Sequence, residues 1–162
     1  MHKAYDFRPL RGEDEVETWA EMVGAQFSSK GGNPRRFYHK YLSDPSSRHD
    51  SVFVAIYPPT GAIAASVRVQ YPNFSQVFDD VSRPPSVSAQ VRVFDRVIRD
   101  GKGRRVRMAG IGEVCTAPDH RKRGLAKRLL HIALEWSKRA GMEISVLHAA
   151  PGVQGLYASL GF

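Results

Sequence analysis

The chain has 162 residues and a formal net charge of +8, and its 42% hydrophobic and 25% charged residues suit one domain that buries its own core. It has no apolar run long enough to span a membrane and no secretory signal at its N-terminus, so we expect a cytoplasmic protein with no membrane partner. The single cysteine, Cys115, excludes an internal disulfide and a cysteine-based metal cluster, and the six histidines show no metal-ligand spacing, so no metal site is expected.

The first part of the chain predicts a strand, two helices and a strand pair. Residues 5–10 alternate as a strand does, and apolar residues then recur at helical spacing up to Phe27. Pro34 stands at the first position of a second helix. Two apolar runs at 51–57 and 62–69 are joined by Pro-Pro-Thr-Gly, which predicts a hairpin.

The middle of the chain combines an irregular segment with basic residues. Residues 70–90 are rich in Pro, Ser and Asp, and Val-Arg-Val stands on both sides, at 67–69 and 91–93, so we interpret them as an insertion between strands. Residues 91–140 carry 14 Lys and Arg against 5 Asp and Glu. The basic turn at 99–107 has no aromatic residue, whereas grooves that bind nucleic acid interleave the two, so nucleic acid is not the expected partner.

A basic loop that leads into a helix is the strongest signal for function. A strand over residues 111–117 ends at Pro118, and His-Arg-Lys-Arg-Gly at 120–124 leads into a helix over 123–139. The N-terminus of a helix carries partial positive charge and usually prefers Asp or Glu, but here three cations crowd it. Free N–H groups and a glycine that permits close approach form a cradle for phosphate. The segment therefore predicts a pyrophosphate site.

The helix over 123–139 predicts packing on a sheet. Its apolar residues share one face: Leu125, Leu129, Ile132, Ala133 and Trp136. Gly141 can supply a left-handed cap. A strand over 143–148, a turn and a short helix follow. The order is β-α-α-β-β, the insertion, then β-β-α-β-α, which is an α/β fold.

Two segments near the end of the chain resemble motifs of the GCN5-related N-acetyltransferase (GNAT) superfamily. Arg121-x-x-Gly124-x-Ala126 is similar to its acyl-CoA-binding motif, and Tyr-Ala-Ser-Leu-Gly-Phe at 157–162 is similar to its C-terminal Tyr-x-x-x-Gly-Phe motif. A helix and a strand separate the two motifs in the order of the superfamily. The resemblance covers residues 109–162.

A narrower resemblance concerns the branch that contains the enhanced-intracellular-survival proteins. Residues 91–96, the Gly-Lys-Gly turn at 101–103 and residues 110–114 are similar to that branch. The superfamily resemblance implies one domain over 1–162, with a mixed, mostly antiparallel sheet flanked by helices. It also implies further strands after Phe162, so we expect the C-terminal part of the domain to be missing, through a shortened or partly resolved chain or through completion by a partner such as a second copy.

The resemblance implies that the protein transfers acetyl from acetyl-CoA to a primary amine by direct attack, without a covalent intermediate. The acceptor is left open between a protein amine, a polyamine and an aminoglycoside-like molecule. Backbone groups of Val114, Cys115 and Thr116 would pair with the pantetheine arm, and an N–H near the first two would face the thioester oxygen. The pyrophosphate would be bound by the loop and the helix start: Arg121, Lys122, Arg123, Gly124, Leu125 and Ala126.

Three residues are candidates for proton transfer. Tyr157 stands where the superfamily motif places a hydroxyl that protonates the departing sulfur, or else it is a buried packing residue. Glu113 is a carboxylate in an apolar strand, and it either deprotonates the amine, through water, or faces solvent or an arginine. His148 is the second candidate base, or a structural histidine. No His or Asp spacing supports Cys115 as a nucleophile.

A non-catalytic GNAT-like scaffold or interaction module within a larger complex is the alternative function. The missing strands and the basic segment at 99–107 favour it. For a scaffold, Tyr157→Phe would leave function intact while charge reversal at Arg104 and Arg105 would damage it. An enzyme predicts the opposite order.

Overall fold

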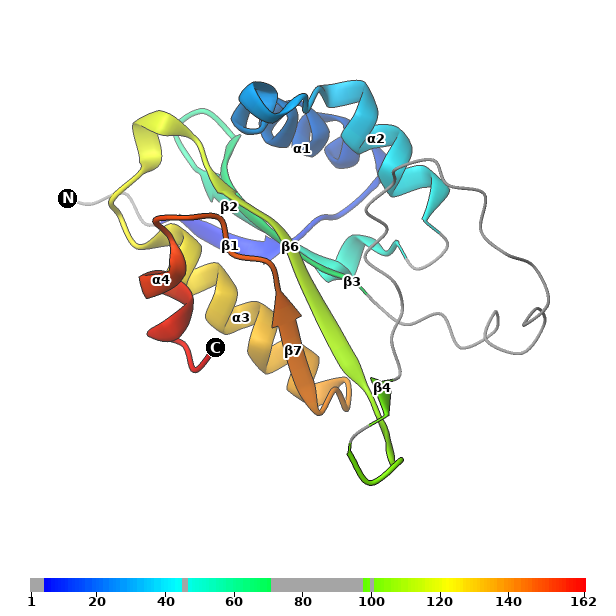
Figure 1. Ribbon diagram of the computed structural model, residues 1–162. Coiled ribbons are helices and arrows are strands. Elements are labelled where there is room, and N and C mark those ends of the chain that lie inside the picture. The colour runs from blue at the N-terminus through cyan, green and yellow to red at the C-terminus, as the bar shows by residue number, and fades with distance from the viewer. Residues whose placement is uncertain (1–4, 45–46, 71–97, 100) are drawn as a thin grey trace.

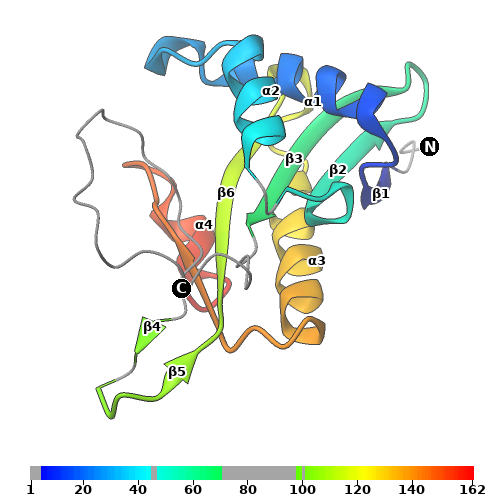
Figure 2. The ribbon, with the colours of Figure 1, turned by 90° about the vertical axis from the view of Figure 1, so that its right-hand side faces the viewer.

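A mixed sheet lies at the centre of the fold. The computed structural model describes residues 5–44, 47–70, 98–99 and 101–162. The sheet has the strand order β1-β2-β3-β6-β7, and the strands span Asp6–Pro9, Val52–Tyr57, Ala62–Gln70, Met108–Thr116 and Ile144–Leu147. Neighbouring strands are antiparallel except β6 and β7, which are parallel. Strands β4 (Ile98–Arg99) and β5 (Arg105–Val106) form a separate antiparallel pair (Figure 2).

Helices cover both faces of the sheet (Figures 1 and 2). Helices α1 (Glu13–Gln26) and α2 (Pro34–Ser43) lie on one face, whereas α3 (Leu125–Arg139) and α4 (Gln154–Ala158) lie on the other. Short 3-10 turns span Ser28–Lys30, His49–Ser51 and Pro118–His120. Within the described ranges, none of these helices is both long and apolar enough to cross a membrane.

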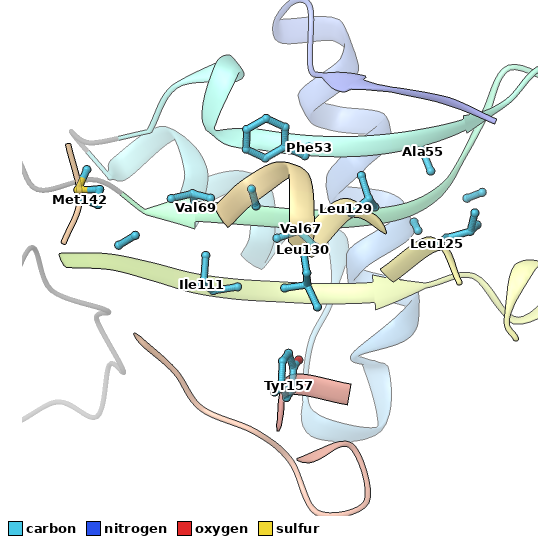
Figure 3. Close-up of a cluster of buried hydrophobic side chains, with 14 residues drawn as sticks. Phe53, Ala55, Val67, Val69, Ile111, Leu125, Leu129, Leu130, Met142 and Tyr157 are labelled. Carbon is cyan, nitrogen blue, oxygen red and sulfur yellow. The ribbon is translucent and has the colours of Figure 1, made fainter. Parts of the chain in front are cut away.

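Alternate residues of β2 contribute to two cores. Phe53 and Ala55 belong to the core under α3, whereas Val52 and Val54 belong to the core under α1, because successive side chains of a strand point to opposite faces. Trp19 of α1 is completely buried in the second core. The helical side chains of the first core are Leu125, Leu129, Leu130, Ala133 and Tyr157 (Figure 3).

The structure confirms the α/β class with a mostly antiparallel sheet and shifts some boundaries. Helix α3 begins at Leu125 rather than 123 because Gly124 takes a left-handed φ of 73°, which ends the loop. Strand β6 begins at Met108, three residues earlier than expected, where it pairs with β7. The segment at 91–96 and all of the expected insertion except Gln70, the last residue of β3, lie outside the described residues.

The expected packing face of α3 is nearly right. Leu125, Leu129 and Ala133 are buried, whereas Ile132 and Trp136 are only partly buried. Leu130 was not expected in this face, and it is fully buried between α3 and the sheet (Figure 3). The buried face, which also includes Ser137, is turned toward Leu130 and away from Ile132 and Trp136, because contact with the sheet and not the spacing alone decides where the face is centred.

Candidate active site

Strand β7 ends before its neighbour β6 does. Their parallel pairing joins Met108–Ile111 to Ile144–Leu147 and stops there. Strand β6 continues over residues 112–116, where β3 pairs with its other edge. Figure 1 shows the chain after β7 leading away from β6 toward α4. Among the described residues no strand pairs with this edge of 112–116, so its backbone groups can bind an extended ligand as an added strand.

A bulge in β6 lies within residues 112–116, the stretch that pairs with β3 but not with β7. Between Ser66 and Arg68 of β3 the register shifts, so that β6 places more residues opposite this pair than β3 does. Glu113 lies in this bulge and has a left-handed φ of 54°, which is uncommon for a residue other than glycine. The fully buried Ser66 hydroxyl donates to the Glu113 carbonyl over 3.3 Å and accepts from Trp19 Nε1 over 3.2 Å. The strained backbone is therefore held by core contacts, which is typical of a functional position.

The basic loop meets the start of α3 as the sequence predicts. Two left-handed residues, Lys122 (φ 59°) and Gly124 (φ 73°), shape the turn. The first helical bond runs from Arg128 N to Gly124 O, so the preceding N–H groups of the first turn have no intrahelical acceptor. No side chain of a described residue caps this end of α3.

A pocket of about 150 Å³ opens at this helix start. A Cβ atom built on Gly124 would meet nothing within 4 Å, so a ligand can approach this backbone closely. The pocket is positive, because four of its side chains are Lys or Arg and none is acidic. Its lining comprises Thr116, His120, Arg121, Lys122, Arg123, Gly124, Leu125, Ala126, Lys127 and Leu156. These properties suit an anionic ligand at a helix N-terminus.

Two of the three loop cations also fix the loop itself. Arg121 donates from Nε to the Thr116 carbonyl over 3.2 Å, and from Nη2 to Gln26 Oε1 over 3.1 Å. Arg123 donates to the Tyr5 hydroxyl over 3.2 Å and to the Asp119 carbonyl over 3.0 Å. These contacts lie on exposed side chains, so the loop keeps positive charge at its surface while it is anchored to β6, α1 and the start of β1.

The contact of Tyr5 with His120, the first residue of the basic loop, is a feature of the site that the sequence did not reveal. The Tyr5 hydroxyl lies 2.9 Å from His120 Nδ1, although 115 residues separate the two along the chain. The His120 ring also packs edge-on against Tyr57 of β2, with ring centroids 4.9 Å apart. These rings connect the basic loop to the edge of the sheet, and no pattern in the local sequence predicts such a contact.

Tyr157 of α4 belongs to the same buried core as the side chains of α3, and its ring lies beside β6 (Figure 3). Only 9% of the residue is exposed, and burial raises the pKa of its hydroxyl above the usual value of 10. Among the described residues the hydroxyl has no hydrogen-bond partner. The phenol therefore keeps its proton at neutral pH and has unused capacity to donate it.

Glu113 belongs to a network of charges between α2 and the sheet. Its carboxylate, 6% exposed, accepts from Lys40 Nζ over 2.7 Å and from Arg68 Nη1 over 3.4 Å. Arg68, 1% exposed, also donates to Asp44 over 2.8 Å. The two non-catalytic interpretations of Glu113 were that its side chain faces solvent or that it faces an arginine. The structure agrees with the second, because Arg68 contacts its carboxylate. Two charged residues inside apolar strands, Glu113 and Arg68, were the sequence signals for this network.

The other two candidate residues differ in exposure. His148 is exposed and follows β7 directly, where the chain leaves β6. The Cys115 thiol is buried against Ser66 and the Met22 sulfur, each 3.6 Å away. Burial raises the pKa of this thiol to about 11, so it is protonated and a poor nucleophile at neutral pH. Among the described residues no cluster of three His, Cys, Asp or Glu side chains could hold a metal ion.

Several solved structures share this fold across most of the chain. A predicted acetyltransferase from Clostridium acetobutylicum, solved with acetyl-CoA, has a TM-score of 0.66 at 14% identity, covering 98% of this chain and 89% of that one. Glucosamine-6-phosphate N-acetyltransferase from Arabidopsis thaliana has a TM-score of 0.63 at 15% identity, covering 98% and 91%. A GCN5-related N-acetyltransferase from Ralstonia eutropha has a TM-score of 0.61 at 22% identity, covering 98% and 92%.

The sequence comparisons agree with the fold. A search of curated proteins found no significant match. The acetyltransferase (GNAT) domain family matches residues 77–162, which is more than half of the chain and includes β6, the basic loop, α3 and α4. The chain belongs to the GNAT acetyltransferase family.

Proposed function

We propose that this protein transfers the acetyl group of acetyl-CoA to a primary amine by direct attack. The observation that carries the proposal is the continuity of the unpaired edge of β6 at 112–116 with the positive pocket at the start of α3. One surface offers both an extended backbone edge and a phosphate cradle. Acetyl-CoA has a matching pantetheine arm and pyrophosphate, and when bound it supplies the reactive thioester.

The chain's own groups fit this cofactor. The N–H groups at Gly124, Leu125 and Ala126, helped by the charges of Arg121, Lys122 and Arg123, would bind the pyrophosphate. The backbone of Val114, Cys115 and Thr116 would bind the pantetheine arm. The bulge beside Glu113 would aim an N–H of Val114 or Cys115 at the thioester oxygen, where negative charge develops.

Proton transfer completes the proposed mechanism. The amine nitrogen forms a bond to the acetyl carbon while the bond from carbon to sulfur breaks. Tyr157 would give its proton to the departing sulfur, because its hydroxyl is protonated and unpartnered among the described residues. Glu113 would take the amine proton through water, with His148, which follows β7, as the alternative base.

The acceptor amine would enter beside Glu113, on the face covered by α1 and α2. A protein amine, a polyamine and an aminoglycoside-like molecule all present the required group. The resemblance to the enhanced-intracellular-survival branch, the single-domain organisation and the cytoplasmic location stay predictions from sequence.

Calorimetric titration with acetyl-CoA tests the proposal. We expect binding to the unaltered protein and a loss of about 100-fold or more for Gly124→Glu, whose carboxylate would project into the phosphate cradle. Gly103→Glu is the matched control, because Gly103 has a similar left-handed φ of 77° and open space but lies in the turn between β4 and β5. Equal loss in both variants would mean a folding defect.

Release of CoA thiol with three acceptors tests the chemistry. A lysine peptide, a polyamine and an aminoglycoside would each be added with acetyl-CoA, and thiol production would be followed by absorbance. Binding of acetyl-CoA without amine-dependent thiol release, or no binding at all, would favour the scaffold alternative.

A further inference from the structure

The two cations on Glu113 differ in how firmly they are held. Arg68 also contacts Asp44 and the Ser47 hydroxyl, and its guanidinium lies 5.2 Å from the Tyr41 ring centroid. It is 1% exposed, so it cannot leave without breaking several buried contacts. This cation is a fixed part of the site.

Lys40 is the exchangeable cation. Its side chain is 39% exposed, and among the described residues its ammonium contacts only the Glu113 carboxylate, at 2.7 Å. Because the Lys40 side chain is flexible and partly exposed, its ammonium can turn into water when another cation takes its place on Glu113. The Glu113 carboxylate beneath it is 6% exposed and cannot follow. Departure of Lys40 would therefore leave a buried carboxylate ready for another cation.

The charges of the network define what would replace Lys40. Without it, the Glu113 carboxylate loses its 2.7 Å cationic contact and keeps, among the described residues, only the longer contact with Arg68 at 3.4 Å. A primary ammonium would restore the lost contact and its charge. Lys40 itself shows that a primary ammonium fits against this carboxylate. Glu113 is also the direct neighbour of Val114, the first residue proposed to contact the thioester arm.

We infer that an acceptor's primary ammonium binds Glu113 by displacing Lys40, so that Lys40 competes with the acceptor and raises its apparent KM. This inference rests on the proposed function and adds a specificity determinant to it. A neutral polar group would not displace Lys40, because it carries no positive charge to replace that of the lysine. The contact between Lys40 and Glu113 thus selects for cationic acceptors.

An NMR titration tests displacement without any turnover. Lysines would be reductively methylated with ¹³C, which keeps their charge, and the Lys40 signal would be assigned by its loss in Lys40→Arg. We expect n-butylammonium at millimolar concentration to move the Lys40 signal toward that of the exposed Lys30. Sodium chloride at equal ionic strength and n-butanol are the controls. A Lys40 signal that stays in place, or that moves equally with sodium chloride, overturns the inference.

Steady-state kinetics with an amine that serves as acceptor give the second test. In Lys40→Met the competing charge is absent, so the KM for the amine should fall about threefold or more, because no bound cation must be displaced first. Lys40→Arg should keep or raise the KM, and Lys30→Met should not change it. An unchanged or higher KM in Lys40→Met contradicts the inference.

The two tests separate this inference from the proposed function. Displacement by n-butylammonium in a protein that never releases CoA thiol would keep the ammonium site and reject the transferase. Acetyl transfer without displacement would keep the transferase and reject the role of Lys40.

Discussion

The proposed cofactor side of the candidate site, residues 114–116 and 121–126, presents mainly backbone groups, whereas the proposed acceptor side presents charged side chains. On the cofactor side, the β6 edge and the first turn of α3 supply N–H and C=O groups. On the acceptor side, Lys40, Asp44, Arg68 and Glu113 come from α2, the residue after it, β3 and β6. This difference shows that a short sequence segment can encode the first half of such a site but not the second.

Backbone groups are positioned by a short run of residues with special conformations. Gly124 takes a φ of 73°, and the loop before it is short and basic, so a run of consecutive residues encodes this part of the site. A charge network has no such requirement, since any fold that brings two cations to two carboxylates suffices. The two sides should therefore fail in different ways when they are mutated.

Arg68→Met should give the largest effect on the acceptor side. Removing one partner of a buried ion pair leaves uncompensated charge, and we expect the free energy of unfolding to fall by about 3–5 kcal/mol. Urea denaturation measures the loss. Arg48→Met is the control, because the pair of Arg48 with Asp50 has side chains 62% and 44% exposed and such pairs contribute about 0–1 kcal/mol. Equal losses in the two variants would show that the network carries no special weight.

Tyr157→Phe should be the largest catalytic effect on the cofactor side. If the phenol protonates the departing sulfur, kcat should fall about 100-fold, which is at the lower end for loss of a general acid. The Kd of acetyl-CoA should stay the same, because no cofactor contact is assigned to the hydroxyl. Because burial raises the pKa of Tyr157, its proton is retained above the usual value of 10, so this acid should not limit kcat below that pH. A kcat within a few fold of the unaltered protein would leave Tyr157 as a packing residue.

Much of the fold could be predicted because it depends on local rules. Pro34 does begin α2, and Gly141 takes the expected left-handed φ of 78° after α3. The hairpin of β2 and β3 follows from its turn residues. The order of β6, the basic loop, α3 and β7 also agrees with the sequence prediction.

The rest depends on contacts between distant residues. The bulge at Glu113 arises from a register shift between β3 and β6, which no pattern within β6 reveals. Lys40 meets Glu113 across 73 residues of sequence, and Tyr5 meets His120 across 115. Such pairs follow from tertiary packing, where burial and charge compensation decide the partners. Arg68 is recognisable in the sequence as a charged residue between Val67 and Val69, but the sequence does not predict which residues contact it.

Tyr5→Phe sharpens the comparison on the cofactor side with a smaller effect. The change removes the hydroxyl that contacts His120 and Arg123, and a lost hydrogen bond typically costs about 0.5–1.5 kcal/mol. If the loop loosens by this amount, the Kd of acetyl-CoA should rise about two- to tenfold. The KM of the acceptor should not change. Tyr38→Phe is the matched control, because the Tyr38 hydroxyl has no hydrogen-bond partner among the described residues. A Kd that responds equally to both changes would remove Tyr5 from the cofactor side.

Cys115 tests the boundary between the two sides, since its backbone lies on the β6 edge and its thiol faces Met22 of α1. With a pKa of about 11, the thiol should react with iodoacetamide about 100-fold more slowly at pH 8 than an ordinary cysteine, and the rate should rise with pH until about 11.

The same pKa affects stability at alkaline pH. An unfolded chain loses the thiol proton near pH 9 while the folded one retains it, so the free energy of unfolding should decrease between pH 9 and about 11. Acetyl-CoA should leave the alkylation rate within about twofold, because the cofactor would contact the backbone of Cys115 and not its sulfur. Strong protection by acetyl-CoA would instead place the sulfur on the cofactor side and show that the bulge does not separate the two.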